Sequence, residues 1–559
     1  MIGNERCTLV SAGDRVMVLR FVFVTSLTVV SGIGGQPAFA QENSGAENSP
    51  EVQAERRLDV FNYQIVGNTA LPQRTIERAV MPFLGPQQSV SNIQAAREAL
   101  LSAYREAGYE AVEVIIPEQD VSDGEIRFKV LEYKVGRLRV EGSKHHPIED
   151  IKRDIPALAP GVVPNYNELA GQIAGLNTSA DKIVTPSLRA GAVPGTVDVD
   201  LFVEDNLPLH GSLELNDRSS ATTERLRLSG SLGYNNLFQA GHSLNLQAQY
   251  VPDAPEESFV ASASYAVPLK SRPITLVGYA VYTDSEVAAV SGINVFGRGK
   301  IFGARGVYSF PVKSGEGAPT VRQVTLGVDY KDFEEDLVVE DNEGKTPISY
   351  VPFSASYAQV QRDIQHEYNI DLGVSFGVRG LGADNKEFRL KRFRADANWI
   401  KLVGGFGYTY KFKNDWRFGG NARFQYAGVP LISNEQFSAG GADSVRGYFE
   451  GQYAGDDGVS ASLEVKTPNL QEYLGSWANE IRFLAFTDHA SLTTHQLLAG
   501  QEGSRNIHSV GLGFNARLLD HLDASLTVAR PQIGREKALE GINELDGDAR
   551  VHFSLKSFF

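Results

Sequence analysis

The chain has 559 residues, with 68 acidic and 53 basic side chains and a formal net charge of −15 at pH 7. Such an acidic balance argues against nucleic acid as a partner. The single cysteine, Cys7, leaves the remaining chain without a thiol for disulfides, metal ligation or catalysis. The histidines are scattered and no His-Glu-x-x-His motif is present, so we expect no enzyme, no metal site and no cofactor.

Residues 1–40 have the pattern of a secretory signal peptide. Arg15 and Arg20 precede the apolar run 21–30, and the small residues Ala38 and Ala40 offer a cleavage site. Residues 41–57 are polar and contain a proline, which predicts a flexible lead-in. Past residue 40 no apolar run reaches the roughly 18 residues of a transmembrane helix, so a membrane role would require a barrel.

Two small α+β modules are predicted next, over residues 58–134 and 135–207. In the first module we expect, in chain order, a strand over 61–65, a helix from Thr75, a helix opened by Ser91, and strands over 111–116 and 125–132. The same order recurs about 75 residues later, which indicates an internal repeat. The matching residues are Gly67, Pro72, Ile76 and Arg78 in the first module and Gly142, Pro147, Ile151 and Arg153 in the second.

Residues 208–559 show strand periodicity. In 209–215 the apolar residues alternate with polar ones, and the windows 225–234, 243–250 and 259–267 continue the pattern. Alternation fits either a soluble sandwich or a membrane barrel. The signal peptide and the closing run Val551, Phe553, Leu555 and Phe559 favour the barrel, and about 350 residues accommodate about 16 strands. We therefore predict a mainly β protein: a transmembrane barrel of about 16 antiparallel strands preceded by two α+β modules.

One segment carries a specific motif. Residues 430–448 contain the pair Gly440-Gly441 and end in Val445-Arg446-Gly447-Tyr448, and the segment resembles the signature of the translocases that combine POTRA domains with a barrel. That resemblance implies a loop near 427–458 that folds into the barrel from the extracellular side. The tight turn at 413–415 supports this placement, because short turns belong on the periplasmic side.

The number of POTRA-like modules indicates a branch of this superfamily. Two modules are typical of the two-partner secretion transporters of the haemolysin secretion/activation type (ShlB/FhaC/HecB). The resemblance implies a monomeric protein in the outer membrane of a Gram-negative bacterium, surrounded by lipid, with its POTRA domains in the periplasm. It also implies export of a secreted, TpsA-like partner protein that is unfolded during transit; whether this partner is activated as well as exported stays open.

An arginine inside the barrel needs a partner, because an unpaired buried charge is costly. The resemblance implies a carboxylate on a nearby inward-facing strand position. Asp488 fits, although Leu484 and Phe486 share its strand parity. We expect Arg446, with Val445, Gly447 and Tyr448 around it, to pair with Asp488 as a loop lock, and Gly440 and Gly441 to act as hinges.

The first module offers a candidate cargo groove. An exported chain can add as a strand to an open sheet edge, and the expected groove walls are Ala111, Val112, Val114 and Ile116 with Leu100 and Tyr104. The same apolar side chains would also suit the core of the module itself. Two other functions stay open at this point: a barrel-assembly insertase for outer-membrane proteins, and a passive porin.

Overall fold

A computed structural model describes residues 57–559 except 178, 270–271, 286, 291–292, 297, 313–319, 335, 340–341, 474, 476, 499 and 533–547. The expected signal peptide and nearly all of the lead-in lie outside the described residues. Contacts group the chain into two compact units, one with residues up to 139, 155–170 and 186–201, the other with 140–154, 171–185 and 202–559. No helix among the described residues is long and apolar enough to cross a membrane.

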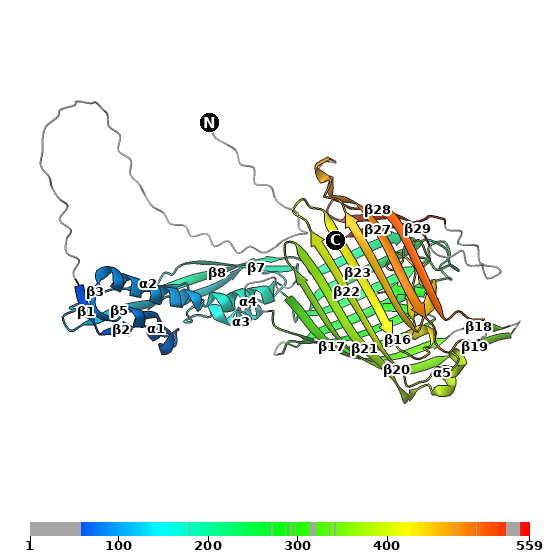
Figure 1. Ribbon diagram of the computed structural model, residues 1–559, viewed down its shortest axis with the longest axis horizontal. Coiled ribbons are helices and arrows are strands. Elements are labelled where there is room, and N and C mark those ends of the chain that lie inside the picture. The colour runs from blue at the N-terminus through cyan, green and yellow to red at the C-terminus, as the bar shows by residue number, and fades with distance from the viewer. Residues whose placement is uncertain are drawn as a thin grey trace, which may run out of the picture. The chain divides into compact units, whose positions relative to one another are not determined.

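The first module has the predicted order of elements, with two further strands (Figure 1, blue). In β2-β5-β4 the first pair of strands is parallel and the second antiparallel, and β1 pairs with β3. Its elements are β1 (Arg57–Val60), β2 (Asn62–Val66), α1 (Gln73–Val80), η1 (Met81–Phe83), β3 (Gly85–Ser89), α2 (Val90–Glu106), β4 (Val112–Ile115) and β5 (Glu125–Glu132).

Helix α2 begins before the predicted residue. Ser89, not Ser91, is its N-cap, and the Ser89 hydroxyl accepts a hydrogen bond from the Asn92 backbone N–H at 3.2 Å. One apolar face of this helix is buried, with Leu100 and Tyr104 fully enclosed. The helix therefore packs its apolar stripe on the sheet, as its periodicity indicated.

The second module repeats the scheme around the sheet β6-β8-β7 (Figure 1, cyan). Its elements are β6 (Lys134–Glu141), α3 (Ile148–Arg153), η2 (Pro156–Leu158), α4 (Tyr166–Leu176), β7 (Lys182–Ala190) and β8 (Thr196–Asp205). Pro72 and Pro147 occupy the same position in the two modules, as N-caps of α1 and α3.

The repeated glycines have a shared structural reason. Gly67 and Gly142 have φ angles of +95° and +91°, a backbone conformation that favours glycine. A Cβ at Gly67 would collide with the carbonyl oxygen of Val130, and one at Gly142 with that of Val203. Each module therefore needs glycine at this turn for conformation and for space.

Sixteen antiparallel strands close into a barrel within the described residues, which confirms the predicted fold class (Figure 1, green to red). They are β9 (Leu209–Asn216), β10 (Arg227–Leu237), β11 (His242–Tyr250), β12 (Phe259–Pro268), β13 (Ile274–Asp284), β16 (Arg298–Ser309), β17 (Thr320–Glu334), β20 (Ile348–Arg362), β21 (His366–Gly382), β22 (Ile400–Lys411), β23 (Arg417–Tyr426), β26 (Asp457–Lys466), β27 (Ala478–Thr493), β28 (Ser504–Leu518), β29 (Leu522–Pro531) and β30 (Arg550–Phe558). The last strand pairs with the first, from Ser554 opposite Asn216 to Phe558 opposite Ser212.

The remaining elements lie in the connections between barrel strands. They are the hairpins β14 (Val287–Val290) with β15 (Ile293–Phe296), β18 (Asp336–Val339) with β19 (Asn342–Lys345), and β24 (Phe437–Ala439) with β25 (Tyr453–Gly455), together with α5 (Asn385–Lys391), η3 (Ser433–Glu435) and η4 (Gln471–Tyr473).

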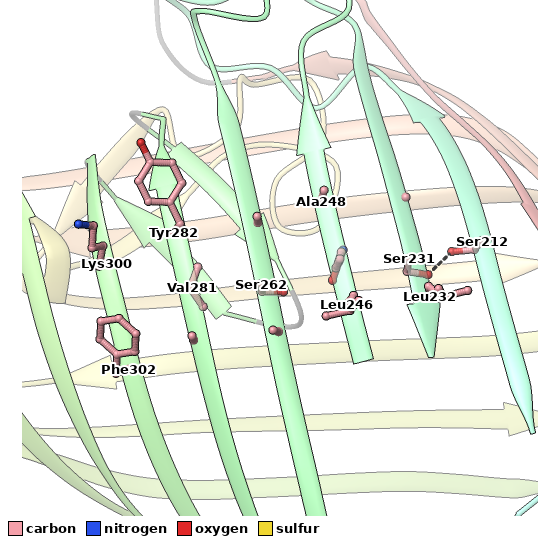
Figure 2. A pocket seen from close by; sticks show the side chains of 15 residues that line it. Ser212, Ser231, Leu232, Leu246, Ala248, Ser262, Val281, Tyr282, Lys300 and Phe302 are labelled. Atoms are coloured by element: carbon pink, nitrogen blue, oxygen red, sulfur yellow. Dashed lines mark hydrogen bonds between the residues drawn. The ribbon is translucent and has the colours of Figure 1, made fainter. Parts of the chain in front are cut away.

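Alternation along the strands separates an outer from an inner face. On β26 the side chains of Val459, Leu463 and Val465 are exposed, whereas Ser460 and Ser462 are buried. On the outer face of β10–β16 lies a hollow of about 710 Å³ with mainly apolar lining. Figure 2 shows Tyr282, Lys300 and Phe302 beside it. The outer face is thus apolar, as contact with lipid requires.

Candidate lumen-closing loop

The connection between β23 and β26, residues 427–456, folds into the barrel; we call it the inward loop. It carries the motif Val445–Tyr448, and Arg446 contacts Ser462 and Glu464 on β26 and Asp488 on β27. These side chains alternate with outward, exposed residues such as Leu463 and Phe483. The loop therefore lies against the inner face of the wall.

Arg446 and Asp488 form a bidentate ion pair. Nε of Arg446 donates to Oδ2 of Asp488 at 2.7 Å, and Nη2 donates to Oδ1 at 2.7 Å. The Arg446 backbone N–H donates to Oδ2 at 3.0 Å. Asp488 is fully buried and Arg446 is 8% exposed. Two parallel hydrogen bonds of this kind fix the orientation of the guanidinium and also compensate its charge.

Two more side chains complete the surroundings of Arg446. Nη1 donates to Oε1 of Glu464 at 2.6 Å, and Nη2 donates to the Ser462 hydroxyl at 3.0 Å. The guanidinium carbon lies 3.4 Å from the centre of the Phe486 ring. Phe486 had counted against an inward assignment of Asp488, because an apolar residue shares its parity. The structure gives the physical reason: its ring is the face on which the cation stacks.

The neighbours of Arg446 in the motif are also held. The Gly447 N–H donates to Nε2 of His552 on β30 at 3.0 Å, and Gly447 has a φ angle of +96°. Val445 and Tyr448 are buried against Ala490, Leu492 and Ile507. Sequence reasoning missed His552, since only the closed barrel brings β30 beside the loop.

Gly440 and Gly441 lie where the loop reverses, with φ angles of +111° and +104°. A Cβ at Gly440 would lie 2.5 Å from the Phe449 carbonyl oxygen, and one at Gly441 would collide with the Glu450 carboxylate. The backbone conformation therefore favours glycine at both positions, and at Gly440 the nearby main chain also leaves no room for a side chain. A hinge function for the pair stays a prediction.

A second ion pair joins the inward loop, near the motif at 445–448, to the connection between β9 and β10. We call this part of the loop around the motif its tip. Arg218 follows β9, and its Nη1 and Nη2 lie 2.5 and 3.1 Å from the carboxylate oxygens of Asp443. Arg550 of β30 lies over the Phe449 ring, 3.4 Å from its centre. Sequence reasoning missed Glu464, Ser462, Arg218 and Asp443; strand parity with Asp488 and register could have indicated only the first two.

The predicted cargo groove is wrong for four of its side chains. Val112, Val114, Leu100 and Tyr104 are buried in the core of the first module, with at most 8% exposure. They fill the interior because β4 places its alternate residues against α2. Ile116 is 36% exposed, and Ala111 is partly buried. Strand β4 pairs with β5 alone and is thus an edge of its sheet.

His145 and His146 in the second module lie in a turn that is held by the carboxylate of Asp205. Oδ2 of Asp205 accepts hydrogen bonds from the backbone N–H groups of Lys144, His145 and His146 at 2.7, 2.7 and 3.0 Å. Nδ1 of His146 lies 2.8 Å from the other oxygen. Burial opposes ionisation, but these donors outweigh it and lower the pKa of Asp205 to about 2.

Comparison with known proteins matches both parts of the chain. A model of the ShlB-type POTRA domain matches residues 58–132. A model of the haemolysin secretion/activation protein ShlB/FhaC/HecB matches residues 345–515, which include the inward loop and Asp488. The resemblance inferred from the motif and the two modules is therefore confirmed.

Individual relatives are distant in sequence. The outer membrane transporter CdiB of Dickeya dadantii (strain 3937) is 22% identical over 452 residues, covering 77% of this chain and 75% of that protein. The structure of CdiB from Escherichia coli has a TM-score of 0.66 at 18% identity, covering 92% of this chain and 93% of that chain. CdiB from Acinetobacter baumannii gives 0.61 at 16% identity, covering 92% and 91%. At these identities the structural likeness concerns the fold.

Proposed function

We propose that this chain, a relative of the ShlB/FhaC/HecB haemolysin secretion/activation proteins, is an outer-membrane pore that exports a partner polypeptide by two-partner secretion. Its POTRA modules lie in the periplasm and its barrel spans the outer membrane. The observation that carries the proposal is the inward loop attached by Arg446, because a folded loop inside a barrel suits a pore that must stay closed between export events.

The barrel suits the passage of an extended chain. Its lumen is lined by polar side chains such as Ser462 and Glu464 of β26, which offer hydrogen bonds to a passing backbone without selecting side chains. Passage requires displacement of the part of the inward loop that blocks the lumen. A closed barrel has no unpaired edge strand, so we propose that a monomer carries out export.

We assign recognition of the exported partner to the first POTRA module. Strand β4 offers the open edge of its sheet, and an unfolded TpsA-like partner would add to it through backbone hydrogen bonds. Ala111 precedes β4 and Ile116 follows it, and these two residues remain as apolar contacts at the two ends of this edge. Selection of cargo then depends mainly on the backbone and on surface residues next to β4.

The deciding experiment compares the surface and culture-medium proteomes of cells with and without the gene. Loss of one large secreted protein from the deletion strain, restored by the wild-type gene, is the expected result. Depletion of many outer-membrane barrels would instead assign the protein to barrel assembly. Unchanged proteomes together with changed uptake of small solutes would assign a passive porin.

A further inference from the structure

The inward loop has a second buried charged attachment, distant along the chain from the motif. Glu435 lies in η3 near the start of the loop and is 2% exposed. Its carboxylate oxygens are 2.6 Å from Nζ of Lys331 and 2.9 Å from Nζ of Lys401. The Tyr350 hydroxyl donates to Oε1 at 2.7 Å. Every partner belongs to the barrel wall.

The main chain around Glu435 is held as well. Its carbonyl oxygen accepts from Nζ of Lys401 at 2.8 Å and from Nε2 of Gln425 at 3.0 Å. The far end of the loop adds Asp456, fully buried, which accepts from the Leu431 N–H at 2.9 Å. The two ends of the loop, together with the hairpin β24-β25, thus form one fixed base.

The two attachments use different arcs of the barrel. Lys331, Tyr350 and Lys401 lie on β17, β20 and β22, whereas Arg446 and Gly447 contact β26, β27 and β30. In the closed strand order these sets do not overlap. The loop therefore spans the lumen between two parts of the wall, and Gly440 and Gly441 separate its base from its tip.

We propose that Glu435 is a second anchor of the inward loop, which keeps the base on the wall while the tip around Arg446 swings about Gly440 and Gly441 to open the lumen. The inference rests on the proposed closure of the pore by this loop. Its physical basis is the balance of charge: without Glu435, two partly buried lysines, with side chains 17% and 14% exposed, lose their shared carboxylate and repel each other. Glu435 is a positioning residue; it need not touch cargo.

The first test measures channel opening of the purified full-length protein in planar bilayers, without any cargo. We expect Glu435→Gln to raise the open fraction about tenfold or more, and Lys331→Gln, which leaves Lys401 in place, to raise it less. The matched control is Glu367→Gln, which breaks an exposed ion pair with Arg362 on the wall and leaves the loop contacts intact. Heat-modifiable migration on gels verifies that each barrel is folded.

A rescue separates anchoring from a general structural effect. Replacing Lys331 and Lys401 by Met together with Glu435→Met removes every charge of the cluster, so the open fraction should return toward that of the wild type. An open fraction of Glu435→Gln equal to that of the control, or an increase that the triple variant retains, would overturn the second anchor.

Single cysteines test which part of the loop moves, since no cysteine follows Cys7. In an Arg446→Ala background, we expect a membrane-impermeant maleimide to label Ala442→Cys faster than in wild type and Ser438→Cys at an unchanged rate. Adding Glu435→Gln should accelerate labelling at both positions. Equal acceleration at both positions in Arg446→Ala alone would contradict a fixed base. These measurements need no cargo. A failure of the second anchor can therefore be distinguished from a failure of the proposed export function.

Discussion

Arg446 stacks on Phe486, with the guanidinium carbon 3.4 Å from the ring centre, while the same guanidinium pairs with Asp488 two residues further along β27. Because residues i and i+2 of a strand point to the same side, one strand supplies both the apolar face and the carboxylate. The cation is thereby held on its edge and on its face.

Arg446→Ala is expected to release the tip of the loop. The variant leaves Asp488 buried without its partner, a loss of about 3–5 kcal/mol. Arg446→Lys keeps the charge but lacks the planar fork that binds both carboxylate oxygens, so it should be intermediate. Limited proteolysis of the loop in outer membranes, with export measured in parallel, is the assay. Unchanged proteolysis and unchanged export in both variants would rule out the lock.

Phe486→Leu is expected to weaken the same attachment by about 0.5–2 kcal/mol, because it keeps apolar volume and removes the cation–π contact. The control is Phe483→Leu on the outer face of the same strand, where the ring is 53% exposed. The ratio of loop cleavage rates in the two variants gives the effect. If Phe483→Leu exposes the loop as much as Phe486→Leu does, stacking is not the cause.

Gly67→Ala and Gly142→Ala should each destabilise their own POTRA-like module. Each forces a side chain into a left-handed backbone, at about 1–2 kcal/mol, and adds a collision with a carbonyl oxygen. Gly161→Ala is the matched control, because it has a φ angle of +87° but open space around its Cβ. Hydrogen exchange of the full-length protein should show greater loss of protection in the first two variants than in the control.

Asp205 predicts a pH dependence for the turn of the second module. Its pKa is lowered from 3.8 to about 2 in the folded state. The stabilisation is therefore complete above pH 4 and is lost as the pH falls through about 2; it amounts to about 2 kcal/mol. Asp205→Asn should lose it at neutral pH as well. Faster amide exchange of Lys144 to His146 in Asp205→Asn at pH 7 is the expected result, and unchanged exchange would contradict it.

The sequence predicted the elements whose signals are local. Strand alternation placed β9, β11 and β12 to within a residue or two, and the repeat around Gly67 and Gly142 placed the two turns. The predicted start of α2 was wrong because two serines suit the N-cap position. Ser89 and Ser91 both have a suitable side chain, and only the path of the backbone selects Ser89.

The burial of side chains decided which of the predicted site residues could act as expected. Val112 and Val114 alternate as a cargo-binding edge would, but the helix covering that face encloses them. For Arg446 the sequence supplied the motif, and parity supplied Asp488 as a candidate. Glu464, two residues from Ser462 on a neighbouring strand, becomes a partner only through register between β26 and β27.

By itself the sequence determined an exported, mainly β chain with two repeated modules and a specific loop motif, because periodicity, turn glycines and short motifs are properties of neighbouring residues. Only the tertiary structure decided which wall residues meet the loop. Glu435 with Lys331 and Lys401, and Gly447 with His552, are pairs separated by 34 to 105 residues. Such pairs form only when the strands close in one register, since closure fixes which inward side chains face each other across the lumen.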